Sequence, residues 1–236
     1  YIMGILNVTP DSFSDGGKWN NYDAAMRHTE ELLKGGCDIL DIGGESTRPG
    51  HQQITEEEEI ERVTPLIEAV KKNFDVPVSI DTYKSRVAGA ALQAGADMVN
   101  DIWGFLYDEE MAPLVKKYDV ACCLMHNRSE AIYENLIEDM CCDLQKCIRA
   151  AKEAGIADDK IMLDPGVGFG KTYEMNLDVM KHLDRFNELG YPMLLGTSRK
   201  SMIGLTLDLP VTEREEGTLV TTVMAVQCGY GFVRVH

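Results

Sequence analysis

The sequence predicts a (β/α)8 barrel, in which parallel strands alternate with helices around one mouth. Eight short apolar runs recur along the chain, and each ends at a polar or charged residue. All but the last are followed by a Gly-rich or hydroxyl-rich loop and a segment with helical periodicity. The length of 236 residues suits one such barrel, and no low-complexity linker divides the chain. We therefore expect a single domain over residues 1–236.

The eight strand candidates are short and largely apolar, as parallel strands buried on both faces should be. They lie at residues 2–8, 38–42, 77–81, 97–100, 120–125, 160–164, 193–196 and 232–235. The polar residues that end them are Asn7, Asp41, Asp81, Asn100, His126, Asp164, Thr197 and the pair Arg234 and His236. Because a barrel collects the C-terminal ends of its strands at one mouth, these residues are expected to converge on one pocket.

The helix candidates between the strands carry recognisable start signals. Thr55 and Glu58 form a capping box before an apolar helical stripe, and Thr212 with Glu215 repeats that pattern. The acidic run 56–59 is then the first turn of a helix, where the helix dipole favours carboxylates, and a metal-binding cluster is the weaker interpretation. The chain starts inside the first strand and stops as the eighth ends, so the final helix of the barrel is expected to be lacking.

The net charge limits the classes of binding partner, and the cysteine content indicates the cellular compartment. The formal net charge of -16 argues against nucleic acid or an anionic membrane, because both require a basic face. An anionic substrate must therefore be held by local cations. The seven cysteines show neither CxxC spacing nor a disulfide framework, which indicates free thiols in a reducing cytoplasm. No apolar stretch reaches membrane-spanning length.

Two polar loops are expected to close over the mouth. Residues 7–17 and 43–50 are rich in hydroxyls and glycine and follow the first and second strands. Asp11 and Phe13 belong to the first loop and Arg48 to the second. Either loop alone could be an ordinary turn, but two loops able to exclude water from one mouth indicate an active site.

The loop after the sixth strand ends in Gly-Lys-Thr and resembles a nucleotide-binding loop, but the match fails. A P-loop needs glycine five positions before Gly170, where Pro165 stands. A dinucleotide fingerprint needs glycine where Lys171 stands. The segment is therefore predicted to be a strand-end aspartate, Asp164, followed by a pliable loop.

The strand ends carry two kinds of chemistry. Asp81, Asn100 and Asp164 offer carboxylates and an amide to a flat, donor-rich heterocycle such as an aminopyrimidinone. Each one alone could instead be a strand-end side chain that bonds loop amides.

Cations follow the seventh and eighth strands, where barrels commonly bind phosphate. They lie in the run 198–201 and at Arg234 and His236, which are two residues apart and share a strand face. His236 could alternatively be a buried, satisfied histidine, and Lys200 could be the Schiff-base lysine of an aldolase.

These segments together resemble the dihydropteroate synthase family of pterin-binding enzymes. The resemblance spans the chain and is carried by residues 4–13, 43–49, 79–82, 100–102, 164–171, 198–204 and 234–236. It implies condensation of 6-hydroxymethyl-7,8-dihydropterin diphosphate with 4-aminobenzoate, which gives 7,8-dihydropteroate and diphosphate in folate synthesis. It also implies a cytoplasmic homodimer. Sulfonamides would compete with 4-aminobenzoate for its pocket.

The resemblance also implies roles for individual residues. The pterin would be held by Asp81, Asn100, Asp164 and Lys200. The diphosphate and its magnesium ion would be held by Asn7, Arg234 and His236. The aminobenzoate pocket would comprise Thr47, Pro49, Phe169, Lys200 and Ser201. Loop closure would involve Asp11, Phe13 and Arg48. The groups expected to act in catalysis are Asp81, Asp164, Lys200, Arg234 and His236.

The implied mechanism begins with cleavage of the C–O bond to diphosphate. A pterin-stabilised cation forms and the aniline nitrogen captures it, so no protein nucleophile is required. One departure from the family is local, because the sequence after Met125 and His126 lacks the Gly-x-Pro that often follows this pair. Two alternatives use the same barrel: a methyltetrahydrofolate-dependent corrinoid methyltransferase, which would need no diphosphate clamp, and a catalytically silent pterin-binding protein.

Overall fold

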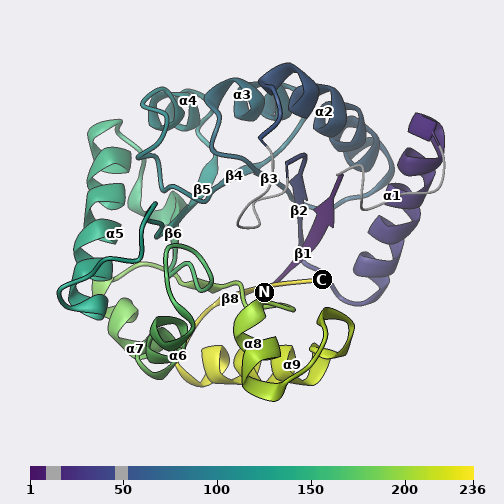
Figure 1. The fold of residues 1–236 in the computed structure, drawn as a ribbon. Helices are drawn as coiled ribbons and strands as arrows, with labels where there is room; N and C mark the ends of the chain where they lie inside the picture. The colour runs from purple at the N-terminus through teal and green to yellow at the C-terminus, as the bar shows by residue number, and fades with distance from the viewer. Residues whose placement is uncertain (9–16, 46–52) are drawn as a thin grey trace.

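The computed structural model describes residues 1–8, 17–45 and 53–236, and for residues 17–21 the backbone alone. Its strands form one parallel eight-stranded sheet in the order β6-β5-β4-β3-β2-β1-β8-β7. A bridge between Leu163 and Met193 joins β6 to β7 and closes the sheet. Figure 1 shows the resulting barrel with the helices ringed outside it. The predicted (β/α)8 barrel is confirmed.

Each predicted strand is present with its bounds shifted by at most two residues. The strands are β1 Ile2–Asn7, β2 Ile39–Gly43, β3 Val78–Asp81, β4 Met98–Asp101, β5 Ala121–Met125, β6 Ile161–Asp164, β7 Leu194–Leu195 and β8 Phe232–Val235. The helices are α1 Gly17–Lys34, α2 Glu56–Asn73, α3 Ser85–Gln93, α4 Met111–Tyr118, α5 Leu136–Glu153, α6 Tyr173–Lys181, α7 Leu183–Phe186, α8 Ser201–Leu207 and α9 Glu215–Gln227. After β8 only His236 remains.

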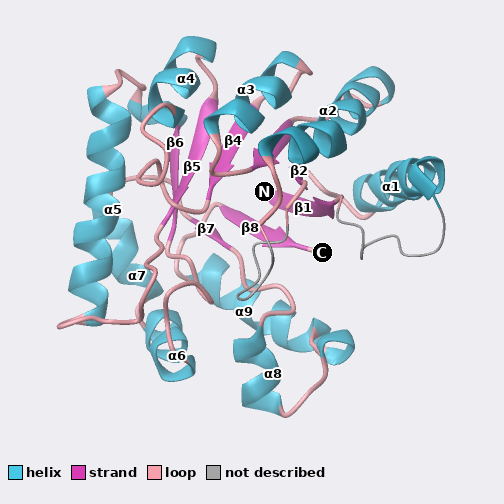
Figure 2. Cartoon of the chain, turned by 45° about the horizontal axis from the view of Figure 1, so that its top comes forward, coloured by secondary structure: helices cyan, strands magenta, loops and turns pink. Residues whose placement is uncertain are grey.

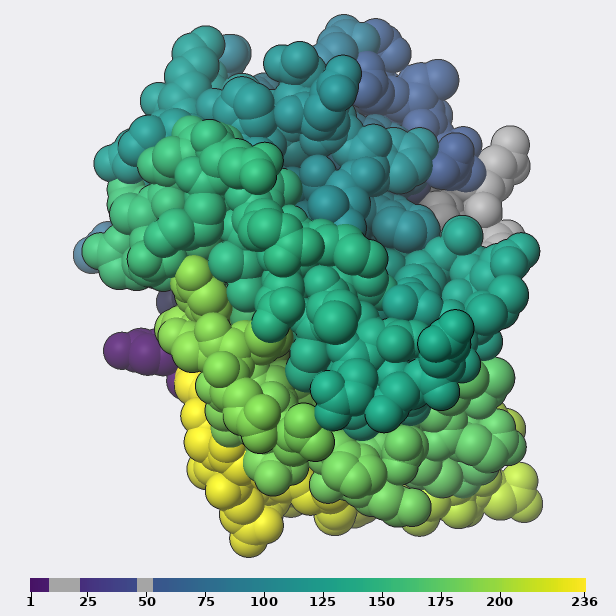
Figure 3. All heavy atoms as spheres, turned by 90° about the vertical axis from the view of Figure 1, so that its left-hand side faces the viewer, coloured from purple at the N-terminus to yellow at the C-terminus, as the bar shows by residue number. Residues whose placement is uncertain are grey.

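The strands alternate between two environments, because successive side chains point to opposite faces of a sheet. One set packs outward against the helices, as Leu40, Val99 and Leu163 do. For example, α5 covers β5 and β6 on the side of the barrel shown in Figure 3. The other set faces the barrel interior, where an apolar floor contains Met3, Met98, Cys123, Met162 and Leu194.

Two residues further along the strands, the inward positions become polar. Ile39 and Met98 are followed by Asp41 and Asn100, and Met162 and Phe232 by Asp164 and Arg234. Asp81 lies beside Asn100 in the register of β3 with β4. The C-terminal half of the barrel interior is therefore a polar layer above an apolar floor, as the strand-end pattern predicts.

The two predicted capping boxes differ in outcome. Thr55 is the N-cap of α2, and its side chain accepts from the Glu58 amide at 3.2 Å. The prediction for Thr212 is wrong: residues 211–213 form a 3-10 turn, and α9 begins after Arg214, with no side-chain cap. The helix starts two residues later than expected because the chain forms a separate turn after Pro210 first.

Thr55→Ala is expected to cost about 1 kcal/mol of stability, the typical effect of losing an N-cap. For a chain of this size the melting temperature should fall by roughly 2–4 °C, which thermal unfolding followed by circular dichroism measures. Thr212→Ala is the matched control and should leave the melting temperature unchanged. Equal falls in both variants would contradict the caps described here.

Candidate active site

A buried ionic cluster occupies the centre of the polar layer. The Arg234 guanidinium lies between two aspartates, with Nε 2.5 Å from Asp41 Oδ2 and Nη2 2.5 Å from Asp81 Oδ2. Asn100 Nδ2 donates to the same Asp41 oxygen at 3.1 Å. These four residues come from β2, β3, β4 and β8, so the barrel closes them onto one point.

Two carboxylate oxygens of the cluster accept no hydrogen bond from the described residues. Asp41 is fully buried and Asp81 is 6% exposed, yet Oδ1 of each has no hydrogen-bond partner among the described residues. Burial raises the pKa of Asp81, and Arg234 opposes that rise. Because an unpaired buried carboxylate oxygen costs free energy, a ligand that brings N–H donors to this point would be bound favourably.

Asp164 and Lys200 form the second half of the site. Asp164 Oδ1 accepts from the Gly166 amide at 2.7 Å. Lys200 Nζ donates to the Val167 carbonyl and lies 4.5 Å from the centre of the Phe169 ring. Burial raises the pKa of Asp164, an effect that Lys200 counteracts, and burial lowers the pKa of Lys200 to about 8.

Two glycines lie in close contact with these groups. A Cβ on Gly43 would lie 3.3 Å from Asn7 Oδ1 and 3.6 Å from Asp81 Cβ. A Cβ on Gly196 would lie 3.7 Å from Asp164 Oδ2 and 3.8 Å from Arg234 Cβ. A larger side chain at either position would therefore press against the polar groups of the site.

The residues predicted to bind the anion lie at the ends of β7 and β8. Ser198 Oγ is 3.0 Å from His236 Nδ1 and accepts from the His236 amide at 3.2 Å, which orients the imidazole. Two of the N–H groups of Arg234 are held by Asp41 and Asp81, and a guanidinium has five. Ser201 is exposed at the start of α8.

The predicted residues fall into two groups. The structure brings together Asp81, Asn100, Asp164, Phe169, Lys200 and Arg234, with Asn7 beside Gly43 and His236 beside Ser198. The predicted residues that lie outside the described part of the chain are Asp11, Phe13, Thr47, Arg48 and Pro49.

Asp41 is the site residue that the sequence analysis left without a role. In the sequence, Asp41 ends the second strand as Asp81 ends the third. This pattern does not distinguish a carboxylate that binds a ligand from one that binds another side chain. Its contact with Arg234 joins residues 193 positions apart. The strand-end pattern was the one sequence signal that could have placed Asp41 among the site residues.

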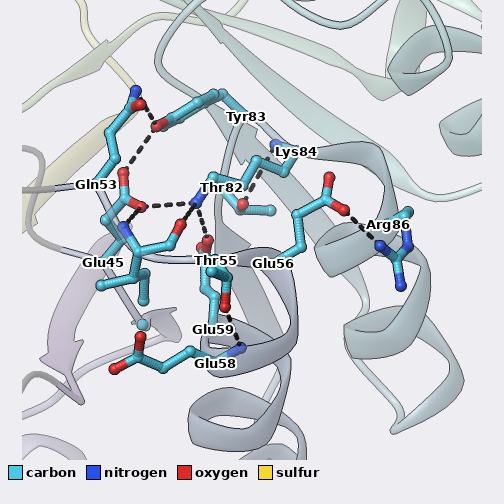
Figure 4. A network of polar contacts seen from close by, with 12 residues as sticks. Glu45, Gln53, Thr55, Glu56, Glu58, Glu59, Thr82, Tyr83, Lys84 and Arg86 are labelled. Atoms are coloured by element: carbon cyan, nitrogen blue, oxygen red, sulfur yellow. Dashed lines mark hydrogen bonds and ion pairs between the residues drawn. The ribbon is translucent and has the colours of Figure 1, made fainter.

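A second buried network lies beside the site at the ends of β2 and β3 (Figure 4). Lys84 Nζ donates to Glu45 Oε2 at 2.6 Å and to Glu59 Oε2 at 2.8 Å. Lys84 Nζ also donates to the Ile54 carbonyl, and Glu45 accepts from Tyr83. The network ties Glu45, which follows β2, to Ile54, which precedes α2.

This network corrects one expectation about the acidic run. Glu59 is 1% exposed and paired with Lys84, so it is not simply part of a solvated first helical turn. Glu58 does behave as expected and pairs with Arg62 on the next turn of α2. No group of three or more His, Cys, Asp and Glu side chains in the described ranges is placed to hold a metal.

Comparison with known proteins identifies the family of the chain. Residues 3–236 match the family model of pterin binding enzymes. A dihydropteroate synthase of Clostridium beijerinckii is 61% identical over 237 residues, which cover 100% of this chain and 88% of the relative.

Two crystal structures have the same fold over the whole chain. Dihydropteroate synthase from Clostridium difficile, in the presence of pteroic acid, superposes with a TM-score of 0.98 at 50% identity and is covered to 90%. The Yersinia pestis synthase with a sulfonamide drug superposes with a TM-score of 0.93 at 41% identity and is covered to 88%.

Proposed function

Because this chain belongs to the family of pterin binding enzymes, we propose that its polar layer carries out the dihydropteroate synthase reaction. The enzyme joins 6-hydroxymethyl-7,8-dihydropterin diphosphate to 4-aminobenzoate and releases diphosphate, in folate biosynthesis. The observation that carries the proposal is the cluster of Asp81, Asn100, Asp164, Lys200 and Arg234 on one barrel interior. The carboxylates and the amide of this cluster suit a ring with many N–H donors, and its arginine suits an anion.

The pterin end uses the carboxylates. Asp164 and Asp81 would accept from the N–H groups of the pterin ring, whose guanidine-like edge suits carboxylates. Asn100 has its Nδ2 committed to Asp41, so its Oδ1 is presented to the ring as a third acceptor. Asp41 thus acts by orienting Asn100 and Arg234.

The anion end uses Arg234, His236 and Asn7. Arg234 and His236 would bind the diphosphate through charge-assisted hydrogen bonds. Asn7 offers one oxygen ligand, which fits a magnesium ion that keeps waters and takes its other ligands from phosphate. When bound, the ion would neutralise charge on the diphosphate.

Catalysis then follows from where charge develops. As the C–O bond breaks, positive charge appears on the pterin beside Asp81 and Asp164, and negative charge appears on diphosphate beside Arg234. Fixed groups of opposite charge stabilise both, without reorganisation at the moment of reaction. The aniline nitrogen of 4-aminobenzoate captures the cation, and excluding water from the mouth prevents its hydrolysis.

The aminobenzoate pocket lies beside the Lys200 and Phe169 pair. Phe169 offers a ring face, and Ser201 begins α8, where backbone N–H groups favour a carboxylate. Thr47 and Pro49 complete the proposed pocket, with Asp11, Phe13 and Arg48 in the closing loops. Sulfonamides, as compact mimics of 4-aminobenzoate, would bind in this pocket.

The alternative activities make different demands. A corrinoid methyltransferase would transfer a methyl group from methyltetrahydrofolate to a corrinoid protein, and a test of that transfer should be negative. An aldolase would form a Schiff base on Lys200, which borohydride and a keto substrate would trap. Lys200 Nζ donates to the Val167 carbonyl and lies over the Phe169 ring, which supports a binding role for Lys200, and no trapped adduct is expected.

We also propose that two copies of the chain pair through α8, α9 and the turn between them, which Figure 2 shows side by side next to β7 and β8. Large apolar side chains on this face are 46% to 64% exposed. They are Leu205, Leu207, Val211, Leu219, Val220, Val223 and Val226. An exposed apolar patch of this kind is typical of an interface.

The variant Leu219→Glu with Val220→Glu is expected to convert the dimer to a monomer, since it places two charges in the apolar face. Sedimentation velocity measures the change. Ile132→Glu is the control, because Ile132 is 68% exposed but lies outside the patch. A monomeric unmodified protein, or a double variant that remains dimeric, would exclude this interface.

The compartment is part of the same proposal. All seven cysteines are free thiols, which supports a reducing cytoplasm. None of the helices in the described residues has the length and apolar character to cross a membrane.

A further inference from the structure

The loop between β6 and α6 has an irregular backbone that backbone hydrogen bonds alone do not hold in place. Gly166, Gly168 and Gly170 have φ values of +67°, +91° and +57°, which side chains rarely tolerate. A Cβ on Gly166 would lie 2.0 Å from the His126 carbonyl oxygen, so the loop packs directly on the backbone after β5. This loop carries Asp164 at its start and Phe169 near its end, so its conformation sets both sides of the site.

The loop is instead held by side chains that donate to its carbonyl groups. Lys171 Nζ donates to the Gly166 carbonyl at 2.9 Å and to the Phe169 carbonyl at 2.8 Å. Lys200 donates to the Val167 carbonyl, and Tyr133 donates to the Gly170 carbonyl at 2.8 Å. Lys171 therefore donates to two of these four carbonyl groups, and that of Gly166 also accepts from the Phe169 amide at 3.1 Å.

The third contact of Lys171 is with His126, whose Nδ1 lies 3.0 Å from Nζ. An ammonium group has three donors, so the three acceptors account for all of them. His126 is 1% exposed, and burial together with the Lys171 charge lowers the pKa of the imidazole. His126 is therefore neutral, and its Nδ1 accepts from Lys171.

His126 links Lys171 to the strands on which the site is built. Its backbone amide donates to the Asp164 carbonyl at 2.9 Å, and its Nε2 lies 3.4 Å from Asp143 on α5. Arg128 donates to Asp143 at 2.7 Å and stacks 4.3 Å from the centre of the Tyr133 ring. The segment that departs from the family after Met125 thus supplies the support for the glycine loop.

We propose that Lys171 is a positioning residue for the reaction, whose ammonium group fixes the β6–α6 loop and so places Asp164 and Phe169. The inference rests on the synthase function proposed above. Lys171 Nζ contacts two backbone carbonyl groups and His126, so it acts through the loop. Its removal takes the donor from the Phe169 carbonyl and from His126 Nδ1, and leaves the Gly166 carbonyl with the Phe169 amide alone.

The test compares Lys171→Ala and Lys171→Met with the unmodified enzyme in steady-state assays. Lys171→Met keeps most of the side-chain volume but has no donor, which guards against a variant that fails to fold. Both should lower kcat about tenfold, because small displacements of positioned groups are costly, and raise KM for 4-aminobenzoate several-fold as Phe169 moves. Lys146→Met is the control: Lys146 also binds Asp143, at 2.6 Å, and this contact does not involve the loop.

Chemical rescue separates positioning from a general effect on folding. Propylammonium replaces the atoms that Lys171→Ala removes and should restore part of kcat and KM. Tetramethylammonium has the charge without N–H donors, and 1-propanol lacks the charge, so neither should restore them.

Three results would overturn the inference. These are variants within twofold of the unmodified enzyme in both constants, a lower kcat with unchanged KM and no rescue, or equal rescue by tetramethylammonium. An inactive unmodified enzyme would instead remove the synthase function on which the inference rests.

Discussion

Asp164→Asn is expected to lower kcat by on the order of a hundredfold or more, the usual scale for losing one preorganised charge contact. The substitution is nearly isosteric, and the new side-chain oxygen can still accept from the Gly166 amide that Asp164 holds at 2.7 Å. The loop should therefore keep its shape. The substitution removes the negative charge that would lie beside the pterin as the cation forms. It also removes the negative charge that faces Lys200.

The measurement is kcat at saturating concentrations of both substrates, with circular dichroism to confirm folding. Asp159→Asn provides the control, since Asp159 is exposed in the turn that precedes the same strand, at the opposite end of the barrel. A kcat near the unmodified value in Asp164→Asn would contradict the role given to this carboxylate.

Arg234→Ala is expected to lower kcat at least as much, because Arg234 would bind the diphosphate and also holds Asp41 and Asp81. Its loss removes a cation from the diphosphate. It also leaves Asp41 and Asp81 without the guanidinium that lies 2.5 Å from each, so that one of them should take up a proton. Turnover should fall by a hundredfold or more.

Breaking a buried ion pair also destabilises a protein, so the activity of Arg234→Ala must be measured well below its melting temperature. Arg234→Lys keeps the charge but cannot span both aspartates, and its kcat should fall between those of the unmodified enzyme and Arg234→Ala. Arg149→Ala, on the exposed face of α5, is the control. A folded Arg234→Ala enzyme with near-native turnover would rule out the proposed clamp.

The fold was predictable because it follows from a repeated local pattern. Four strands place an apolar residue on the barrel floor and a polar one two positions later, as Met98 with Asn100 and Met162 with Asp164. That period of two marks both the strand and the end of the barrel at which the site lies.

What the sequence could not provide depends on distant partners. The burial of Glu59 requires Lys84, which lies 25 residues away, and the role of Asp41 requires Arg234. The capping pattern at Thr212 was misleading because a local signal competes with the turn that Pro210 starts. The predictions for Asp11, Phe13 and residues 47–49 stand as predictions, since these residues lie outside the described ranges.

The most direct test of the central claim is diphosphate release from 6-hydroxymethyl-7,8-dihydropterin diphosphate, measured with magnesium, in the presence and absence of 4-aminobenzoate. The site described here predicts release that depends on 4-aminobenzoate, with one 7,8-dihydropteroate formed for each diphosphate. Omission of magnesium should slow release if Asn7 and the diphosphate share the ion. Tight binding of the pterin with no release in either arm would contradict the synthase and point to the methyltransferase or to a silent pterin-binding barrel.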